Sequence, residues 1–275
     1  MPWLFAFAAF ALGAIVGSFL NVVIHRYPLG ESVVLPPSHC PHCNTLIRPY
    51  DNIPILSWLI LLGRCRACRE PITARYPLVE LANALFYLAI FQRTGLSFTF
   101  LPLAAIVSMT IALIYIDLDI QILPDVIDLP GVAIGLAMGA LHVGALVPDL
   151  MLSATLLESV AGAAAGAGIL LAIGMTYKLV RKIEGMGLGD VKMMAMLGAV
   201  MGWEPVMFIL IIASTAGALV GVLIALRSNG GMQTALPFGV FLGIAALVML
   251  FFGRAMMSAV LPWLAPGGAT LAAWP

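Results

Sequence analysis

Two Cys-x-x-Cys pairs are the clearest chemical pattern in this sequence. Cys40-Pro-His-Cys43 and Cys65-Arg-Ala-Cys68 are separated by 21 residues, a spacing typical of a zinc ribbon in which four thiolates hold one tetrahedral metal. The alternative, two disulfides, is disfavoured in a reducing cytoplasm. His39 and His42 stand beside the first pair and are interpreted as bystanders rather than ligands. A closed four-thiolate site has no open coordination position, so the pattern predicts a structural zinc.

Two aspartates border apolar runs and form the second chemical pattern. Asp117 ends the run 113–116, whereas Asp190 closes Gly187-Leu188-Gly189-Asp190 and precedes another apolar run. Peptide hydrolysis by carboxyl groups needs one ionised group to activate water and one protonated group to polarise the carbonyl. Two carboxyls that share a site do not both ionise easily, so their pKa values split. The sequence therefore predicts a catalytic pair of Asp117 and Asp190, with the helix dipole favouring negative charge at Asp190.

Other charged residues near this pair have simpler interpretations. Asp119, Asp125 and Asp128 are read as exposed loop carboxylates or as helix caps around Pro124. Lys192 follows Asp190 by two residues. Its side chain is read first as a lysine that reaches out of the membrane to water, and second as a cation that attracts the substrate or tunes the pair.

The elements that must position these residues are predicted to be membrane-spanning helices. The 275-residue chain is 62% apolar and 9% charged, with a mean hydropathy of +1.08, whereas soluble domains carry about 25% charged residues. A span needs about 20 apolar residues. Eight segments are predicted as spans: Trp3–Ile24, Pro77–Phe91, Phe98–Ile116, Val126–Val147, Ser153–Leu179, Val191–Met201, Pro205–Leu226 and Ala235–Met256. The predicted fold is an all-α polytopic membrane protein of about eight transmembrane helices, with a small zinc-ribbon-like subdomain between the first two.

The loops between these spans carry basic residues unevenly. The first apolar run lacks the basic residues that open a secretory signal peptide, so it is predicted to be a retained span with its N-terminus outside. Alternation then places 26–76, 117–125, 178–192 and 227–234 in the cytoplasm, together with eleven of the thirteen Lys and Arg residues. The predicted organisation is a first transmembrane helix over 1–25, a cytoplasmic zinc-binding loop over 26–76 and a membrane-embedded core over 77–265.

Six ordered motifs resemble those of the bacterial type IV prepilin peptidases, which belong to the GxGD aspartyl proteases. In chain order they are Gly17-Ser18-Phe19-Leu20-Asn21-Val22-Val23-Ile24-His25-Arg26, the two Cys-x-x-Cys pairs, Tyr76-Pro77-Leu78-Val79-Glu80, the Asp-x-Asp-x-x-x-Leu-Pro-Asp segment from Asp117 to Asp125, Gly187-x-Gly189-Asp190, and Pro237-Phe238-Gly239. A single GxGD would be weak, but six motifs in order over nearly the whole chain are specific. The stretch between Asp117 and Asp190 is somewhat longer than is usual in the family, chiefly near 141–150.

The resemblance implies a function and its site residues. Family members cleave the leader of type IV prepilins and type II secretion pseudopilins at the cytoplasmic face of the bacterial inner membrane. Many then methylate the new N-terminal amine with S-adenosylmethionine. By position, Asp117 and Asp190 match the catalytic pair, while Asp119 and Asp125 match supporting positions. Prepilins, pseudopilins and membrane lipid are thus the expected partners.

Methyl transfer is implied by the resemblance alone. The sequence has no recognisable soluble methyltransferase fold and no glycine-rich nucleotide loop, so the residues that hold a methyl donor are not predicted. Glu80 begins a predicted span and is interpreted as a membrane-border acid that pairs with a residue such as Arg75; a role with the methyl donor is the second interpretation.

Three other functions compete with this interpretation. A proton- or cation-coupled transporter with a zinc-ribbon regulatory loop would place its aspartates near mid-membrane and often shows internal repeats, of which none is found. A membrane scaffold would leave Asp117 and Asp190 without a role. A GxGD protease of another substrate class would share the same chemistry. The net charge of zero gives no indication of a nucleic-acid partner.

Overall fold

The computed structural model describes residues 2–182, 186–227 and 236–264. The predicted 227–234 loop lies almost wholly outside these residues, as does Gly185 before the GxGD segment. The chain forms two compact units, Met1–Ile120 and Gln121–Pro275. Within the described residues the regular structure is helical, apart from two isolated antiparallel bridges. The all-helical prediction is thus confirmed.

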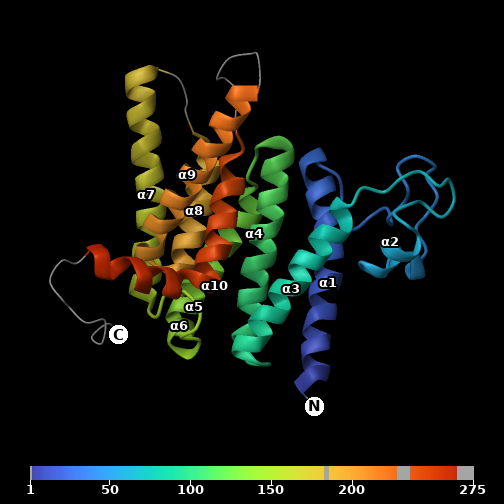
Figure 1. Cartoon of the computed structure of the whole chain (residues 1–275), viewed down its shortest axis with the longest axis horizontal. Helices are drawn as coiled ribbons and strands as arrows, with labels where there is room; N and C mark the ends of the chain where they lie inside the picture. Colours follow the sequence, from blue (N-terminus) through green and yellow to red (C-terminus); the bar gives the residue numbers. More distant parts are fainter. Residues whose placement is uncertain (1, 183–185, 228–235, 265–275) are drawn as a thin grey trace. The chain divides into compact units, whose positions relative to one another are not determined.

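Three long helices form the frame of the first unit: α1 (Pro2–Arg26), α3 (Arg75–Thr94) and α4 (Phe100–Ile120) (Figure 1). Glycines let α1 and α3 approach closely, because a Cβ at Gly13 would lie 2.7 Å from the Ala84 Cα and one at Gly17 would lie 2.7 Å from the Glu80 Cα. Small residues four apart allow such contact between membrane helices. The buried Asn83 amide donates to the Gly13 carbonyl at 2.7 Å, which satisfies a polar group in the apolar interior.

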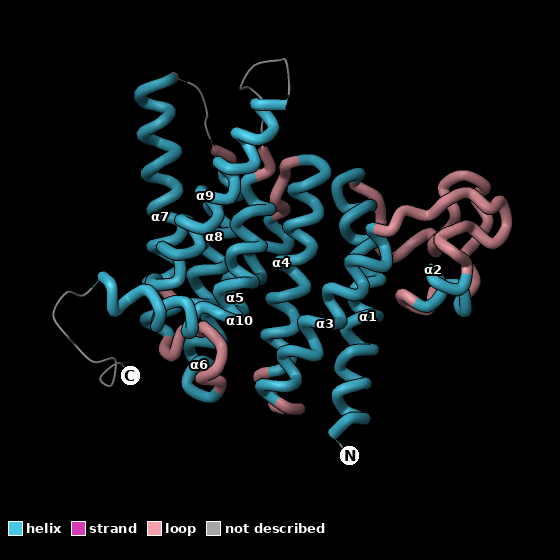
Figure 2. The backbone as a smooth tube through the Cα atoms, in the orientation of Figure 1, coloured by secondary structure: helices cyan, strands magenta, loops and turns pink. Residues whose placement is uncertain are grey.

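A polar segment connects α1 to α3 and contains little regular structure. Its helices are short: η1 (Tyr27–Leu29), η2 (Pro49–Asp51) and α2 (Leu56–Ile60). Figure 2 shows that this segment is mostly loop, whereas the other described parts of the chain are mostly helix. Between 27 and 74 only Cys40, Ser57 and Gly63 are buried. This segment lacks an apolar core of its own and needs another source of stability.

The described part of the second unit contains six helices, four of which pack around α8: α5 (Asp125–Ala140), α6 (Val143–Leu146), α7 (Leu156–Arg181), α8 (Leu188–Met201), α9 (Trp203–Arg227) and α10 (Phe238–Leu264). The α8 helix contacts α5, α7, α9 and α10, and its Met193, Met194 and Met196 side chains have no exposed surface. A Cβ at Gly162 of α7 would overlap the Gly198 carbonyl oxygen of α8, and the reverse also holds. Backbone-to-backbone contact therefore holds α7 against α8.

Among the described residues, five helices are long and apolar enough to cross a membrane: Trp3–Leu29, Phe100–Ile120, Leu156–Arg181, Trp203–Arg227 and Phe238–Ala259. They correspond to five of the eight predicted spans and indicate a multi-pass membrane protein. Of the other three predicted spans, Pro77–Phe91 and Val191–Met201 each lie in a single helix, whereas Val126–Val147 is divided into α5 and α6 by a turn at 141–142. However, α5 and α8 have 16 and 14 residues, fewer than the roughly 20 that a straight span requires, and α3 is less apolar because it carries Arg75, Glu80 and Arg93. As membrane spans these three remain predictions.

Candidate metal centre and carboxylate sites

The four cysteines come together in the polar segment of the first unit. Their sulfur atoms all lie within 4.8 Å of one another, with 3.8 Å between Cys40 and Cys68 and 4.0 Å between Cys43 and Cys65. All four are free, so the disulfide alternative does not apply. Tetrahedral zinc with Zn–S bonds of about 2.3 Å holds neighbouring sulfurs about 3.8 Å apart. The cluster is thus a possible metal site whose geometry suits zinc.

Local contacts prepare this cluster for a metal. The Cys40 N–H donates to the Thr45 carbonyl, and the Cys65 N–H donates to the Glu70 carbonyl, so each pair lies in its own turn. The Thr45 hydroxyl, 3.3 Å from the Cys43 sulfur, and the Thr45 backbone lower the pKa of that thiol to about 6. In the same cluster, against a backbone hydrogen bond from Glu70 that lowers it, burial and the three other thiols raise the pKa of Cys68 to about 12. Because the thiolate is the form that binds metal, Thr45 favours the ligand form of Cys43.

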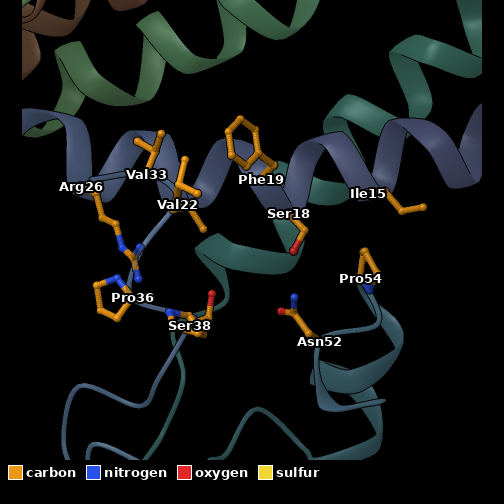
Figure 3. Close-up of a pocket in the computed structure, with 12 residues that line it drawn as sticks. Ile15, Ser18, Phe19, Val22, Arg26, Val33, Pro36, Ser38, Asn52 and Pro54 are labelled. Atoms are coloured by element: carbon orange, nitrogen blue, oxygen red, sulfur yellow. The ribbon is translucent and has the colours of Figure 1, made fainter. Parts of the chain in front are cut away.

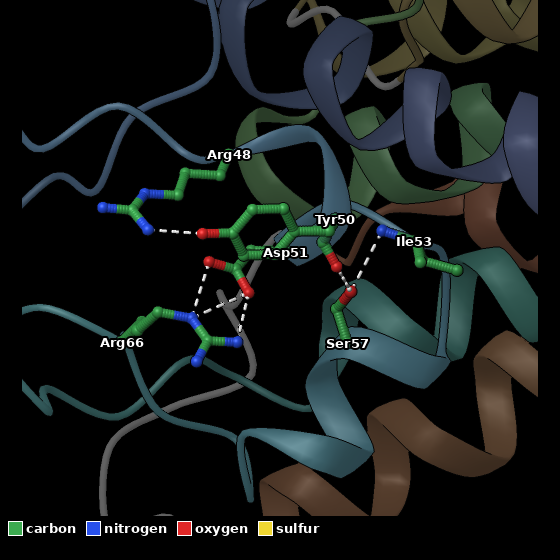
Figure 4. Close-up of polar contacts among 6 residues, drawn as sticks. All are labelled: Arg48, Tyr50, Asp51, Ile53, Ser57 and Arg66. Carbon is green, nitrogen blue, oxygen red and sulfur yellow. Dashed lines mark hydrogen bonds and ion pairs between the residues drawn. The ribbon is translucent and has the colours of Figure 1, made fainter.

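An ion pair connects the two halves of the segment (Figure 4). The Arg66 guanidinium, beside the second cysteine pair, donates to both Asp51 carboxylate oxygens at 2.6 to 2.9 Å. Arg66 and Arg48 both lie over the Tyr50 ring. The Ser57 hydroxyl donates to the Tyr50 carbonyl at 3.1 Å and accepts from the Ile53 N–H at 3.0 Å. These polar contacts fix the segment between the cysteine pairs.

Asp117 lies in the last turn of α4, where it was predicted, and only 4% of it is exposed. Arg75, at the start of α3, contacts this last turn of α4. Its guanidinium donates to the Asp119 carboxylate at 2.6 Å and to the Tyr115 carbonyl at 3.3 Å. On the other side of α3, the Asn21 amide of α1 donates to the Tyr76 carbonyl at 3.1 Å. The C-terminal ends of α1 and α4 and the start of α3 therefore meet at one end of this unit.

The hypothesis that Glu80 pairs with Arg75 is wrong. Arg75 pairs with Asp119, while the buried Glu80 carboxylate accepts from the Ile55 N–H at 2.7 Å and contacts the Ser18 hydroxyl. Arg75 and Glu80 are five positions apart on α3, so their side chains lie on different faces of the helix and do not meet. Its role is to anchor the polar segment on α3.

Asp190 lies in the first turn of α8, as predicted, after Gly187 at the N-cap. A Cβ at Gly189 would lie 2.8 Å from the Leu123 Cβ, so glycine is required there for α8 to pack on the Leu123-Pro124 segment. At Gly187 an added Cβ would lie 3.8 Å from the Asp190 carboxylate, an ordinary contact. The two glycines of the GxGD segment thus differ: Gly189 allows a close approach, whereas Gly187 begins the helix.

A second contact joins the same two segments. The Lys192 ammonium donates to both Asp125 oxygens, at 2.6 and 2.8 Å. Both side chains are partly exposed. Asp125 is therefore an ion-pair partner of the GxGD helix, which neither the loop nor the cap interpretation predicted.

Asp128 differs most from its sequence interpretation. It is fully buried, and neither carboxylate oxygen has a hydrogen-bond partner in the described part of the chain. Asp128 follows Asp125 by three residues, almost one helical turn, so it lies near the same face of α5. From this spacing, the proximity of Asp128 to Asp125 was predictable. The burial of Asp128 was not, because it depends on packing that the sequence does not show.

Phe238 and Met186, the residue just before the GxGD motif, border a common cavity. This cavity, of about 330 Å³, lies among α7, α9 and α10 and is lined by Met186, Phe238 and Phe241, among other apolar side chains. Phe238 of the Pro-Phe-Gly motif and the residue that precedes the GxGD motif thus line one apolar space in the second unit. The first unit holds Asp117 and Asp119, and the second holds Asp125, Asp190, Lys192 and both glycines.

Comparison with known proteins gives one consistent family. Residues 11–94 match the bacterial peptidase A24 N-terminal domain, and residues 104–222 match the type IV leader peptidase family. A prepilin leader peptidase/N-methyltransferase from Aeromonas hydrophila is 38% identical over 281 residues, covering 92% of each chain. One of the same name from Pseudomonas putida is 39% identical, again over 92% of each chain.

A shorter match agrees with these two. A prepilin leader peptidase/N-methyltransferase from Myxococcus xanthus is 42% identical over 230 residues, which cover 82% of this chain and 65% of the relative. No solved structure matches the chain. The two domain matches in order and the identity over nearly the full length of two relatives show that this chain belongs to the type IV leader peptidase family.

Proposed function

We propose that this protein is an aspartic endopeptidase that removes the leader of type IV prepilins and type II secretion pseudopilins and then methylates the new N-terminal amine. The observation that carries the proposal is the identity of 38 to 39% over 92% of relatives named prepilin leader peptidase/N-methyltransferase. The chain aligns with these relatives along both of its matched domains. The transporter alternative gains no support from these matches.

Asp117 and Asp190 are proposed to be the catalytic pair. Asp190 opens a helix, where unpaired backbone N–H groups favour a carboxylate, and it acts as the base that takes a proton from water. Asp117 is buried at the end of α4 and acts as the acid that protonates the scissile carbonyl oxygen. Collapse of the tetrahedral intermediate breaks the C–N bond, and the leaving amine takes up a proton. The two carboxyls titrate as one unit.

Supporting residues hold this pair in place. Gly189 lets α8 reach Leu123, while Lys192 fixes Asp125 and Arg75 fixes Asp119. In this account none of Asp119, Asp125 and Lys192 reacts with the substrate; they orient the segments that carry the catalytic carboxyls. Gly187 begins the helix that carries Asp190.

The cysteine cluster is proposed to hold a structural zinc. The four sulfurs supply a closed tetrahedral set, and metal binding supplies the stability that the small buried surface of residues 27–74 does not. The proposed functional division is a first helix over 1–25, a zinc loop over 26–76 and a protease core over 77–265. Hydrolysis by two carboxyls needs no metal, so zinc organises the loop.

Membrane placement follows from the charges of the loops. The proposed location is the bacterial inner membrane, with the N-terminus outside and the zinc loop and carboxyls towards the cytoplasm, because eleven of thirteen basic residues then lie inside. Arg26, Arg75 and Asp117 lie at one end of the first unit, in agreement with a border position. Lipid is thus the solvent of the apolar helices, and no nucleic-acid partner is proposed.

The test is cleavage of a purified prepilin by the detergent-solubilised protein, with the products weighed by mass spectrometry. The account predicts loss of the leader and, when S-adenosylmethionine is added, a further gain of one methyl group. Cleavage without the added methyl group would support the proposed protease activity and contradict the proposed methyltransferase activity. An intact prepilin, with folded protein and a positive control from a relative, would overturn the proposal.

A further inference from the structure

The first unit contains a cavity that the peptidase chemistry does not use. It lies between α1 and the polar segment, has a volume of about 360 Å³ and is lined by residues of both. Pockets for small molecules measure about 300 to 1,000 Å³. All of its lining residues fall within the match to the N-terminal domain, and none falls within the match to the leader peptidase family. The cavity is thus available for the second activity in the relatives' name.

One wall of this cavity carries an arginine without an acidic partner. Arg26 is 8% exposed, and its guanidinium donates a hydrogen bond to the Ser32 carbonyl at 3.1 Å. In the described residues it has no ion pair. Guanidinium presents several N–H donors in a planar fork, and buried charges are normally paired. The dipole of α1 favours a cation at this end, but it does not explain why the cation is buried beside an open space.

The other lining groups complete a mixed polar and apolar site (Figure 3). Ser18 and Asn52 point toward one another across the space, whereas Arg26 extends toward Pro36 and Ser38. Val22 and Phe19 add apolar surface from the same helix. A ligand with an anionic end, a polar middle and an apolar or aromatic part matches this arrangement. S-adenosylmethionine has a carboxylate, a ribose and an adenine.

The cavity also lies close to the chemistry within its own unit. Arg26 ends α1, and Asn21 of the same helix is bonded to the start of α3, which Arg75 ties to the end of α4 beside Asp117. A peptide cut at Asp117 thus has its new amine at the end of the unit that carries the cavity.

We propose that this cavity binds S-adenosylmethionine and that the Arg26 guanidinium pairs with the carboxylate of its methionine part. The inference rests on the proposed methyl transfer and adds the site and its cation. Arg26 binds the donor and Asn52 supplies hydrogen bonds to its polar groups, while the Ser18 oxygen, whose hydroxyl donates to Glu80, accepts one. The methyl group passes from the donor's sulfonium to the nitrogen of the new N-terminus, which loses a proton, and the donor leaves as the thioether.

The experiment measures donor affinity rather than turnover. Equilibrium binding of S-adenosylmethionine and of its decarboxylated analogue is compared for the full-length wild type, Arg26→Gln and Arg64→Gln. Arg64 is exposed in the same polar segment and serves as the matched control. Losing a charge-assisted hydrogen bond weakens binding by about tenfold or more. We expect Arg26→Gln to lose this much affinity for S-adenosylmethionine and Arg64→Gln to lose none. The wild type should bind the decarboxylated analogue more weakly than S-adenosylmethionine by the same factor.

The pattern of outcomes separates the site from the activity. Arg26→Gln should bind the decarboxylated analogue no more weakly than it binds S-adenosylmethionine. Its zinc content and its rate of leader cleavage should match those of the wild type. If Arg26→Gln does not fold, the analogue on wild type alone decides: equal affinity for both donors overturns the site. If the wild type methylates and Arg26→Gln binds S-adenosylmethionine as tightly as the wild type does, the proposed site is overturned but the methyl transfer activity stands. Wild type that neither binds nor methylates removes the proposed methyl transfer as well.

Discussion

The polar segment between α1 and α3 and the helices around α8 are stabilised in different ways. In the segment, three residues between 27 and 74 are buried, and order comes from turns, one ion pair and four converging cysteines. In the second unit, α8 is surrounded by four helices, and Gly162 and Gly198 bring two backbones into contact. We propose that the first region depends on a bound metal, whereas the second depends on packing. Each can therefore be disrupted without the other.

Removing a metal ligand has the largest expected effect. Cys40→Ser leaves three thiolates and should lower the zinc content from one per chain to nearly none, because metal binding and folding of such a segment are coupled. Methyl transfer should fall with it. Zinc content by elemental analysis and helix content by circular dichroism are the measurements.

The helices provide the control for this variant. Helix content should change little in Cys40→Ser, because the segment contributes only short helices. Addition of a strong chelator to wild type should reproduce the result. A large loss of helix on zinc removal would contradict the separation of the two regions.

Gly189→Ala should cause the next largest effect, on cleavage. The added Cβ would lie 2.8 Å from the Leu123 Cβ, so the start of α8 and Asp190 must shift. A displacement of about 1 Å in an active site costs about 100-fold in rate. Gly187→Ala meets no atom closer than 3.8 Å and should cost less than about tenfold by the same reasoning. Steady-state cleavage rates of both variants test the difference, and equal losses would sink the packing role of Gly189.

Gly162→Ala should destabilise the second unit and leave the zinc site intact. Its Cβ would overlap the Gly198 carbonyl and Gly202 backbone, and overpacking of this kind costs about 1 to 3 kcal/mol. Gly168→Ala is the matched control on the same helix, because its Cβ meets nothing within 4 Å. There alanine should stabilise by about 0.5 to 1 kcal/mol. Thermal unfolding of each purified variant measures the pair, and equal shifts would argue against the close α7–α8 contact.

Loss of the Asp51–Arg66 ion pair should have the smallest effect. The Arg66 guanidinium lowers the pKa of Asp51, so the pair contributes stability above the ordinary Asp value of about 4 and loses it as the pH falls through the lowered value. The Arg66 side chain is 50% exposed, whereas the Asp51 side chain is 9% exposed. A pair with one partner open to solvent contributes little. Asp51→Asn should thus lower the melting temperature of the segment slightly at pH 7, and the difference from wild type should shrink in acid. A difference that grows in acid would contradict this assignment.

Some of this structure follows from sequence pattern and some does not. The cysteine cluster was predictable because ligand number and spacing are local properties, and the placement of Asp117 and Asp190 at helix ends follows from where apolar runs stop and start. The partners of Arg75 and Lys192 were not predictable. They lie 44 and 67 residues away and depend on how helices pack.

Helix length limited the prediction of spans. An apolar run marks α5 and α8 as buried helices, but protein contacts rather than lipid bury α8, and hydropathy does not separate the two environments. The burial of Asp128 and Arg26 was also hidden, because a charged residue is read as exposed until its neighbours are known.

The central claim is that Asp117 and Asp190 act as one catalytic pair. The most direct measurement is the cleavage rate of Asp117→Asn, Asp190→Asn and the double variant, with zinc content and melting temperature as folding controls. Residues that act as a unit have non-additive effects, so each single variant should lose about 1,000-fold or more and the double variant should lose no more than either. A single variant that keeps a tenth of the wild-type rate, or a double variant whose loss is the product of both, would contradict the account.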